Sequence, residues 1–230
     1  HTNDRRQRQM CIRDSYDTTR VSLLSNWNHG WKIANGIILD FENELGLSKY
    51  NVQQHADIGP EETRIFGAGA VGLRWPWYRI NSTGGIGIIE PQIQLVRSVS
   101  SNSVVPNDDS TQVEFDEGNL FRLNRAPGLD LIEHGTRLNV GLTGSQFMDS
   151  GDNLSWKIGR VIRSEALSTF PSGSGLSNSI SDWLLATNFQ QKNGIELINR
   201  AVIASDGAVT KSETSLKLGS GPHQIKATHV

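Results

Sequence analysis

Asp130 and Glu133 are the two residues whose type and spacing come closest to a catalytic pair. Paired carboxylates can act as proton donor and acceptor when their surroundings separate their pKa values. The residues on both sides of the pair are typical of a loop, which favours a structural role. In that interpretation the two carboxylates bind Arg125 or Arg137, and neither takes part in catalysis.

A second group of acidic residues could bind a divalent cation through carboxylate oxygens. The group lacks the spacing of a calcium-binding loop, so a solvated acidic loop is the favoured interpretation. The sequence has no His-x-x-x-His, Cys-x-x-Cys or His-Glu-x-x-His pattern, and its six histidines are scattered. We therefore expect no metal and no cofactor. The acidic residues are Asp108, Asp109, Glu114, Asp116 and Glu117.

Two glycine-rich stretches imitate functional motifs without their structural context. The stretch 67–72, GAGAVG, imitates a dinucleotide fingerprint, but it lies inside an expected strand and no helix follows. Its glycines are better explained as places where a strand bends. The stretch 172–175, SGSG, lacks the strand and helix that flank a nucleophile elbow. We expect that the protein is not an enzyme.

Charge and hydropathy exclude two further classes of protein. The chain of 230 residues has 22 Lys+Arg against 24 Asp+Glu, so it has no basic field for nucleic acid. No uninterrupted apolar run reaches the length of about 18 residues that a transmembrane helix needs. A transmembrane strand needs only about 10 residues with every second one apolar, so a membrane location stays open.

Apolar and polar residues alternate along much of the chain, which is the pattern of strands with one apolar and one polar face. Residues 31–42 follow this period apart from Ile38, as do residues 64–75, 89–95, 137–143 and 156–163. The residues expected on the apolar face include Ile89, Ile93, Leu95, Leu138, Val140 and Leu142. Those expected on the polar face include Glu90, Gln92, Gln94, Arg137 and Asn139.

Tight turns and long loops separate roughly nine or ten expected strands. Lys192-Asn193-Gly194 is a two-residue hairpin signal, and residues 148–153 and 205–207 mark further turns. Long connections are expected at about Gly46–Thr63, Ser98–Gly135 and Ser168–Asn178. No internal repeat is apparent, which argues against propellers and solenoids. The expected fold class is all-β, an antiparallel meander.

Such a meander fits either a soluble β-sandwich or a transmembrane barrel of the outer membrane. Strands of roughly 10–13 residues, longer than those of most globular sheets, favour the barrel. Charged and amide side chains on the polar face suit a wet lumen, and the lumen-facing candidates are Glu90, Gln92, Gln94, Arg137 and Asn139. Aromatic residues near strand ends are typical of the girdles of membrane barrels, and they are Trp27, Trp31, Trp75, Trp77, Tyr78, Phe147 and Trp183.

The most informative stretch is Val105–Leu142, VPNDDSTQVEFDEGNLFRLNRAPGLDLIEHGTRLNVGL. It has too many apolar residues for a freely solvated linker, so we expect an ordered loop that leads into a strand. This stretch resembles the middle of the barrel of the LptD family of outer-membrane lipopolysaccharide-assembly proteins. The resemblance covers roughly Trp31 to Leu218. It rests mainly on Pro106, Asn107, Asp108, Asp109, Ser110, Asn119, Leu120, Phe121, Arg125, Gly128, Asp130, Glu133, Gly135, Arg137, Asn139, Gly141 and Leu142.

The resemblance implies a barrel in the outer membrane of a Gram-negative bacterium that delivers lipopolysaccharide to the outer leaflet. It implies an LptE-like plug lipoprotein, an LptA-like periplasmic bridge protein and outer-membrane lipids as partners, with no nucleic acid. One alternative is another outer-membrane barrel, such as a porin or a barrel enzyme. A second alternative is a soluble β-sandwich that binds or hydrolyses carbohydrate.

Residues 1–15, HTNDRRQRQMCIRDS, differ from the rest of the chain because they are basic and have no strand or helix period. They resemble translated adaptor sequence, so we expect a non-native or disordered segment. Residues 16–230 are expected to form one partial β-barrel domain, truncated at both ends. The family's gate-forming strands and paired cysteines do not fall within it, so neither the gate nor a disulfide is predicted.

Overall fold

The computed structural model describes residues 17–53, 58–82, 84–101, 103–107, 113–167, 169–219 and 224–230. In these residues the chain forms one antiparallel sheet of eleven strands and a single 3₁₀ turn, η1 (Ala34–Gly36). The expected all-β antiparallel fold is confirmed. No helix in the described part of the chain is long and apolar enough to cross a membrane. Residues 1–15 lie outside the described residues, so the expectation for that segment stays a prediction.

The strands follow one another as a meander, and most are longer than ordinary globular strands. Their bounds are β1 (Asp17–Lys32), β2 (Ile38–Gln53), β3 (Glu61–Arg74), β4 (Trp77–Ile80), β5 (Ile86–Ser100), β6 (Gly135–Phe147), β7 (Asn153–Arg163), β8 (Trp183–Gln190), β9 (Ile195–Ile203), β10 (Val209–Leu218) and β11 (Ile225–His229).

Neighbours in the sheet are neighbours in the sequence, except at β4. Strand β5 pairs with β3 along its second half and with β4 along its first half, so β3 and β4 together flank β5 like one interrupted strand. The interruption falls at Trp75-Pro76, where proline has no N–H to donate to the ladder. The Trp75 N–H still donates to the Pro91 carbonyl at 3.1 Å, which keeps the two halves aligned.

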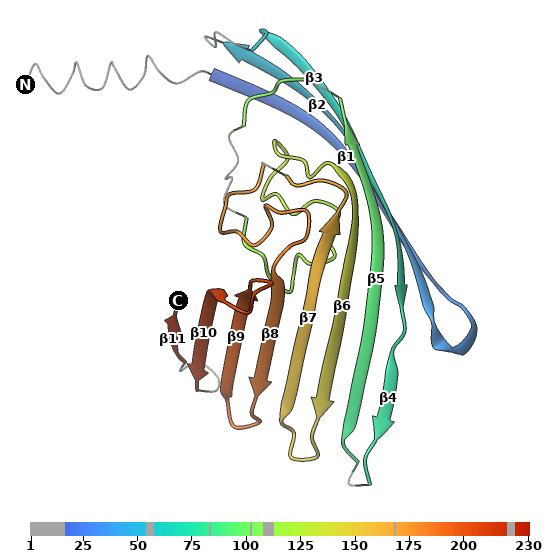
Figure 1. Ribbon diagram of the computed structural model, residues 1–230, viewed down its shortest axis with the longest axis vertical. Coiled ribbons are helices and arrows are strands. Elements are labelled where there is room, and N and C mark those ends of the chain that lie inside the picture. Colours follow the sequence, from blue (N-terminus) through green and yellow to red (C-terminus); the bar gives the residue numbers. More distant parts are fainter. Residues whose placement is uncertain are drawn as a thin grey trace, which may run out of the picture.

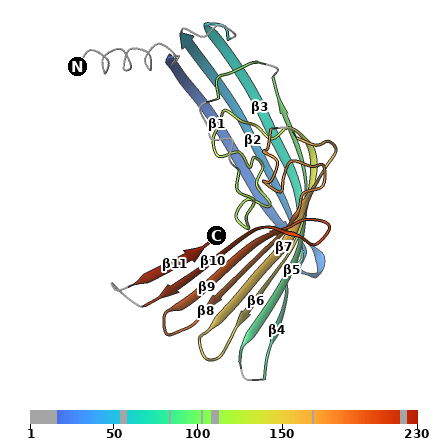
Figure 2. The same cartoon turned by 60° about the vertical axis from the view of Figure 1, so that its left-hand side comes forward.

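The sheet is strongly curved, and two long loops lie inside the curve (Figures 1 and 2). We call the concave side the inner face and the convex side the outer face. Gln94, Asn139 and Val161 are paired in one row of the inner face. The five residues predicted for the polar face all lie on the inner face, and they are Glu90, Gln92, Gln94, Arg137 and Asn139. The six residues predicted for the apolar face, from Ile89 to Leu142, all lie on the outer face.

The outer face is apolar and uncovered. Leu23 is 71% exposed, Ile65 61% and Leu95 53%, values far from those of a sheet that packs against a second layer. By strand register Trp27, Trp31, Trp77 and Trp183 also lie exposed on this face. Tyr78 and Phe147 lie on the inner face instead, so they cannot belong to an aromatic girdle on the outer face.

The expectation of one strand through residues 31–42 is wrong, because the chain turns there. Asn35 and Gly36 have φ angles of 58° and 78°, and the Ile37 N–H donates to the Ala34 carbonyl at 3.3 Å. Positive φ at two successive residues is the feature of a type I′ turn, for which Asn-Gly is the favoured pair. The Ile33 N–H also donates to the Ile37 carbonyl at 2.8 Å, so residues 34–36 connect the two strands. Strands β1 and β2 therefore form a hairpin at this point.

The expected long connection at Gly46–Thr63 is also wrong, because strand structure fills most of it. Strand β2 continues to Gln53, and β3 begins at Glu61. Tyr50 and Val52 are buried on the inner face, while Lys49 is exposed on the outer face. The polarity of the two faces is thus reversed at this end of the sheet. A smaller correction concerns residues 192–194, where three residues rather than two form the hairpin turn, since the Gln191 N–H donates to the Ile195 carbonyl.

Candidate functional site

Two long loops fill the hollow of the inner face. The first connects β5 to β6, and we call its described residues 113–134 the anchored loop. The second, residues 164–182, connects β7 to β8. Side chains of both loops form one hydrophobic cluster with the sheet. Its buried members are Val113, Phe115 and Leu120 of the anchored loop, Phe170 and Leu176 of the second loop, and Val161, Leu184 and Val202 of the strands.

Two glycines of the sheet provide the flat surface on which the anchored loop lies. A Cβ on Gly159 would lie 2.4 Å from the Leu120 side chain, and a Cβ on Gly141 would lie 3.0 Å from the Phe121 ring. Any larger residue at Gly159 would therefore push the loop away from the sheet. This packing agrees with the expectation that the stretch forms an ordered loop.

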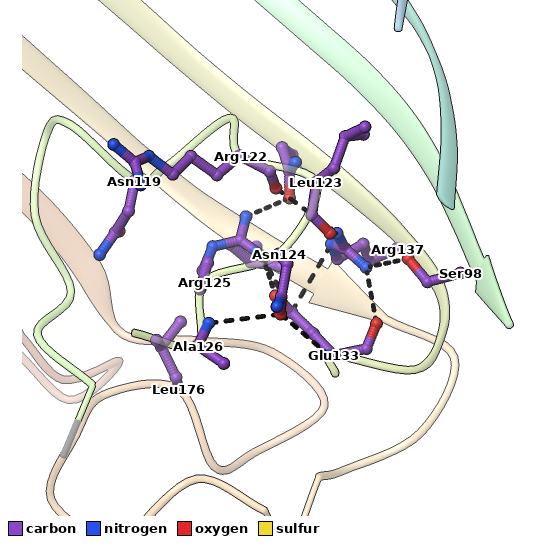
Figure 3. Close-up of polar contacts among 12 residues, drawn as sticks. Ser98, Asn119, Arg122, Leu123, Asn124, Arg125, Ala126, Glu133, Arg137 and Leu176 are labelled. Carbon is purple, nitrogen blue, oxygen red and sulfur yellow. Dashed lines mark hydrogen bonds and ion pairs between the residues drawn. The ribbon is translucent and has the colours of Figure 1, made fainter. Parts of the chain in front are cut away.

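Glu133 holds the anchored loop through a buried cluster of arginines (Figure 3). Its carboxylate accepts from Arg125 of the same loop at 2.7 and 2.9 Å and from Arg163 of β7 at 2.8 and 3.0 Å. Arg137 of β6 lies 3.6 Å from the same carboxylate. The predicted pairing of Glu133 with Arg125 and Arg137 is confirmed, and Arg163 was not expected there.

The cluster carries a net charge of about +2, since three guanidinium groups surround one carboxylate, and it is almost wholly buried. Burial by itself would raise the pKa of Glu133, but the attraction of Arg125, Arg137 and Arg163 outweighs it and lowers that pKa. Burial lowers the pKa of Arg125 despite its bond to Glu133. Glu133 is thus ionised at neutral pH and is the counter-charge on which the three arginines depend.

Further hydrogen bonds extend the cluster across the inner face. Arg125 donates to the Leu120 carbonyl at 2.6 Å and to the Asn139 side chain at 2.7 Å. Asn139 in turn donates to Gln94 at 2.7 Å, and Gln94 donates to Glu42 of β2 at 3.3 Å. Polar residues of β2, β5 and β6 are therefore linked in one chain of hydrogen bonds that ends in the anchored loop.

Asp130 forms a second anchor on the opposite side of the hollow. Its carboxylate accepts from the Tyr50 hydroxyl at 2.8 Å and from Arg20, which binds it as an ion pair. Arg64 donates to the Asp130 carbonyl at 2.6 Å and to the Leu129 carbonyl. This anchor ties the loop to β1, β2 and β3. The sequence had indicated Arg125 or Arg137 as partner of Asp130, whereas its carboxylate here binds Arg20 and Tyr50.

A third anchor joins the loop to β7, β9 and β10. Glu117 accepts three bonds of 2.7–2.9 Å from Arg200, and its carbonyl accepts from Lys157 at 3.0 Å. Glu114 pairs with Lys211 at 3.1 Å in a more exposed position. Asp116 accepts from the N–H groups of Gly118 and Asn119, which is a local turn. The described acidic residues of the candidate cation site, Glu114, Asp116 and Glu117, therefore bind lysine, backbone N–H groups and arginine respectively.

The three anchors connect one loop to strands from both halves of the sheet. Glu117 reaches β9, Glu133 reaches β6 and β7, and Asp130 reaches β1, β2 and β3. Such an arrangement holds a loop in a fixed position against the sheet. In the described residues no group of three or more His, Cys, Asp or Glu side chains could hold a metal ion.

The structure brings some of the predicted motif residues together and leaves others apart. Leu120, Arg125, Glu133, Arg137 and Asn139 meet in the Glu133 cluster, while Gln94 lies beside it. Glu90 lies farther along β5, 3.8 Å from Arg74, and Gln92 follows on the same face. Gly135, with a φ of 90°, starts β6. Pro106 is buried and Asn107 exposed, Gly128 lies in a bend beside Pro127, and Asp108, Asp109 and Ser110 lie outside the described residues.

The partners that sequence reasoning missed are Arg20, Tyr50, Arg163 and Arg200. Each follows the strand period with its side chain on the inner face, and that parity was the only available signal. Their separation from the loop residues ranges from 30 to 110 positions, so the register of the sheet decides which of them meet.

Comparisons with known proteins add one finding. A family model described as LptD: LPS transport system D matches residues 1–217, which is most of the 230 residues. The comparison with curated proteins finds no match.

Proposed function

The chain belongs to the LptD family, LPS transport system D, and on this premise we propose that its sheet is part of the wall of a barrel that assembles lipopolysaccharide into the outer membrane. The observation that carries the proposal is the division of the sheet into an exposed apolar outer face and a polar inner face that holds a loop. A membrane barrel has this division, with lipid outside and a polar lumen inside. The proposed role is transport without catalysis.

The two ends of the sheet support an orientation in the membrane. Turns at one end are short, as at residues 148–152 and 191–194, whereas the anchored loop and the second loop lie at the other end. Outer-membrane barrels have short periplasmic turns and longer extracellular loops. The proposed orientation places the short turns in the periplasm and both long loops at the cell surface.

One charged residue on the outer face fits this placement. Arg160 of β7 points outward, yet its guanidinium donates to the Ser181 carbonyl at 2.6 Å and to the Ser205 hydroxyl at 3.3 Å. It also lies 4.7 Å from the centre of the Trp183 ring. A long cation that bends toward polar groups at a strand end while an aromatic ring covers it is the usual arrangement at a membrane interface.

The inner face is proposed to line the lumen, with Glu90, Gln92, Gln94, Arg137 and Asn139 as its polar residues. The anchored loop narrows the lumen but leaves a gap of about 400 Å³ beside β1 and β2. Residues that line the gap include Asn28, Glu44 and Arg122. Lipopolysaccharide and an LptE-like plug lipoprotein are the proposed neighbours of this surface, and an LptA-like bridge protein is proposed to deliver the lipid.

Photo-cross-linking in cells tests this function. A benzoylphenylalanine at Asn28 of the full-length protein is expected to cross-link lipopolysaccharide or the plug, because it faces the gap. The same group at Leu95, on the outer face, is expected to cross-link neither the plug nor lipid in transit. If neither lipopolysaccharide nor a plug is captured at Asn28, a different kind of barrel, such as a porin, is the better reading.

A charge placed on the outer face tests its contact with lipid. Leu142 lies on this face between Pro91 and Ile158. It is two residues away from Val140, which is the residue paired with Arg160. Leu142→Arg in the full-length protein is expected to cost about 2–4 kcal/mol of barrel stability near mid-membrane. The control is Thr143→Arg, on the inner face of the same strand, which should cost clearly less. Unfolding in lipid vesicles measures both, and equal costs would argue against lipid contact.

A further inference from the structure

A groove of about 390 Å³ lies at the short-turn end of the sheet, where β4, β5, β6 and β7 meet. Six of its lining residues lie on the outer face according to the strand register. Trp77, Ile89 and Trp156 belong to one row, and Arg79, Gly87 and Gln146 belong to the next row toward the turns. The groove therefore opens on the side that is proposed to meet lipid.

Two glycines let longer side chains lie flat over β5 and β6 beside the groove. Gly87 and Gly144 present no side chain to the outer face, and longer neighbours bend over them. A Cβ on Gly144 would lie 2.2 Å from the Trp156 ring, and one on Gly87 would lie 2.9 Å from the Gln146 amide oxygen. Trp77 and Trp156 line the groove from β4 and β7, with Ile89 of β5 in the same row. This aromatic and aliphatic lining accepts a hydrocarbon chain.

Arg79 stands at the end of this apolar groove without a counter-charge. It is exposed, and among the described residues it takes part in no ion pair and no side-chain hydrogen bond. Asp149 of the adjoining turn lies over Gly84 and Gly85 and makes no ion pair with Arg79. An arginine beside an aromatic and aliphatic lining matches a ligand that has one phosphate and an acyl chain.

We infer that this groove binds one phospholipid of the leaflet on the short-turn side, with its phosphate at Arg79 and one acyl chain between Trp77 and Trp156. The inference rests on the proposed membrane placement of the outer face. A phospholipid is preferred to a peptide because the groove opens among exposed apolar residues such as Ile89, which is 44% exposed. A single arginine also suits one phosphate better than the several of lipopolysaccharide.

Native mass spectrometry of the full-length protein from detergent tests the inference, with phosphatidylglycerol as the added probe. The wild-type protein is expected to retain one phospholipid. Arg79→Ala should lower the retained fraction about tenfold, because it removes a charge-assisted bond to phosphate. Arg79→Lys should retain most of the binding. Trp77→Ala should also lower it, through loss of part of the lining.

The control is Arg97→Ala, which removes an outer-face arginine that is bound to Thr136 near the other end of β5. It should leave lipid retention unchanged, and heat-dependent migration on gels confirms that each variant folds. Equal retention by wild-type protein and Arg79→Ala would overturn the inference while leaving the membrane placement intact. Retention of no phospholipid by the wild-type protein would also overturn the inference, whereas the Leu142→Arg comparison tests the membrane placement separately. Preferential retention of added lipopolysaccharide at Arg79 would overturn the choice of lipid.

Discussion

Deletion of Asn119–Asp130 from the full-length protein is expected to abolish or strongly impair lipopolysaccharide delivery while the strands still form. The deletion removes Leu120 from the hydrophobic cluster and Arg125 from the Glu133 cluster, and it removes Asp130 from its bonds to β1 and β2. The sheet would keep its ladders, because none of these residues belongs to a strand. The hollow, however, would lose the element that fills and shapes it.

Two measurements check this result. Antibody detection of lipopolysaccharide at the cell surface reports delivery, and sensitivity to large antibiotics reports the barrier. A matched variant replaces Asn119–Asp130 with a Gly/Ser linker of the same length, so that the connection remains and only the contacts are lost. Both variants should fail alike. Normal delivery in the linker variant would show that the loop is only a connector.

Glu133→Gln is expected to destabilise the anchored loop by about 3–5 kcal/mol, the usual cost of leaving buried charges without their partner. The substitution keeps the size of the side chain but leaves Arg125, Arg137 and Arg163 facing one another with no counter-charge. We expect faster proteolytic cleavage between β5 and β6 and faster amide exchange there. Glu114→Gln is the matched control, because Glu114 is 72% exposed in its pair with Lys211 and should contribute little.

The pH dependence of the same bond has a definite sign. The pKa of Glu133 in the folded protein is lowered below the ordinary 4.5. The stabilisation of the anchored loop by the ionised Glu133 carboxylate is therefore fully present above pH 4.5. It is lost as the pH falls through the lowered pKa. Loop release on acidification should therefore begin below pH 4.5 in the wild-type protein. The Glu133→Gln variant should lack this step, and a step of equal size in the variant would assign it to another carboxylate.

The face of each strand residue could be predicted because alternation is a local property of the chain. The apolar set from Ile89 to Leu142 shares the outer face as expected. Alternation gives a wrong prediction where the polarity of the two faces changes along a strand, as at Tyr50. It also gives a wrong prediction where a turn happens to continue the alternation, as at Asn35-Gly36. In the second case the Asn-Gly pair was itself a turn signal that the alternation concealed.

Apolar residues at positions on the polar inner face indicate where loops cover the sheet. Val161 lies on the inner face between Gly159 and Arg163, and it is wholly buried under the two loops. Leu184 of β8 and Val202 of β9 are likewise buried on the inner face under the loops. Apolar side chains at these positions indicate where loops cover a face that is otherwise polar, because an apolar group gains stability only when it leaves water.

The sequence by itself determined the all-β class, most hairpin turns, the two faces of the sheet and the ordered character of the anchored loop. Each of these follows from neighbouring residues through alternation, turn chemistry or apolar content. Only the tertiary structure decided that Glu133 meets Arg163, that Asp130 meets Arg20 and that Glu117 meets Arg200. Those pairs depend on strand register and on the curvature of the sheet, which bring distant charges together across the hollow and which no local pattern specifies.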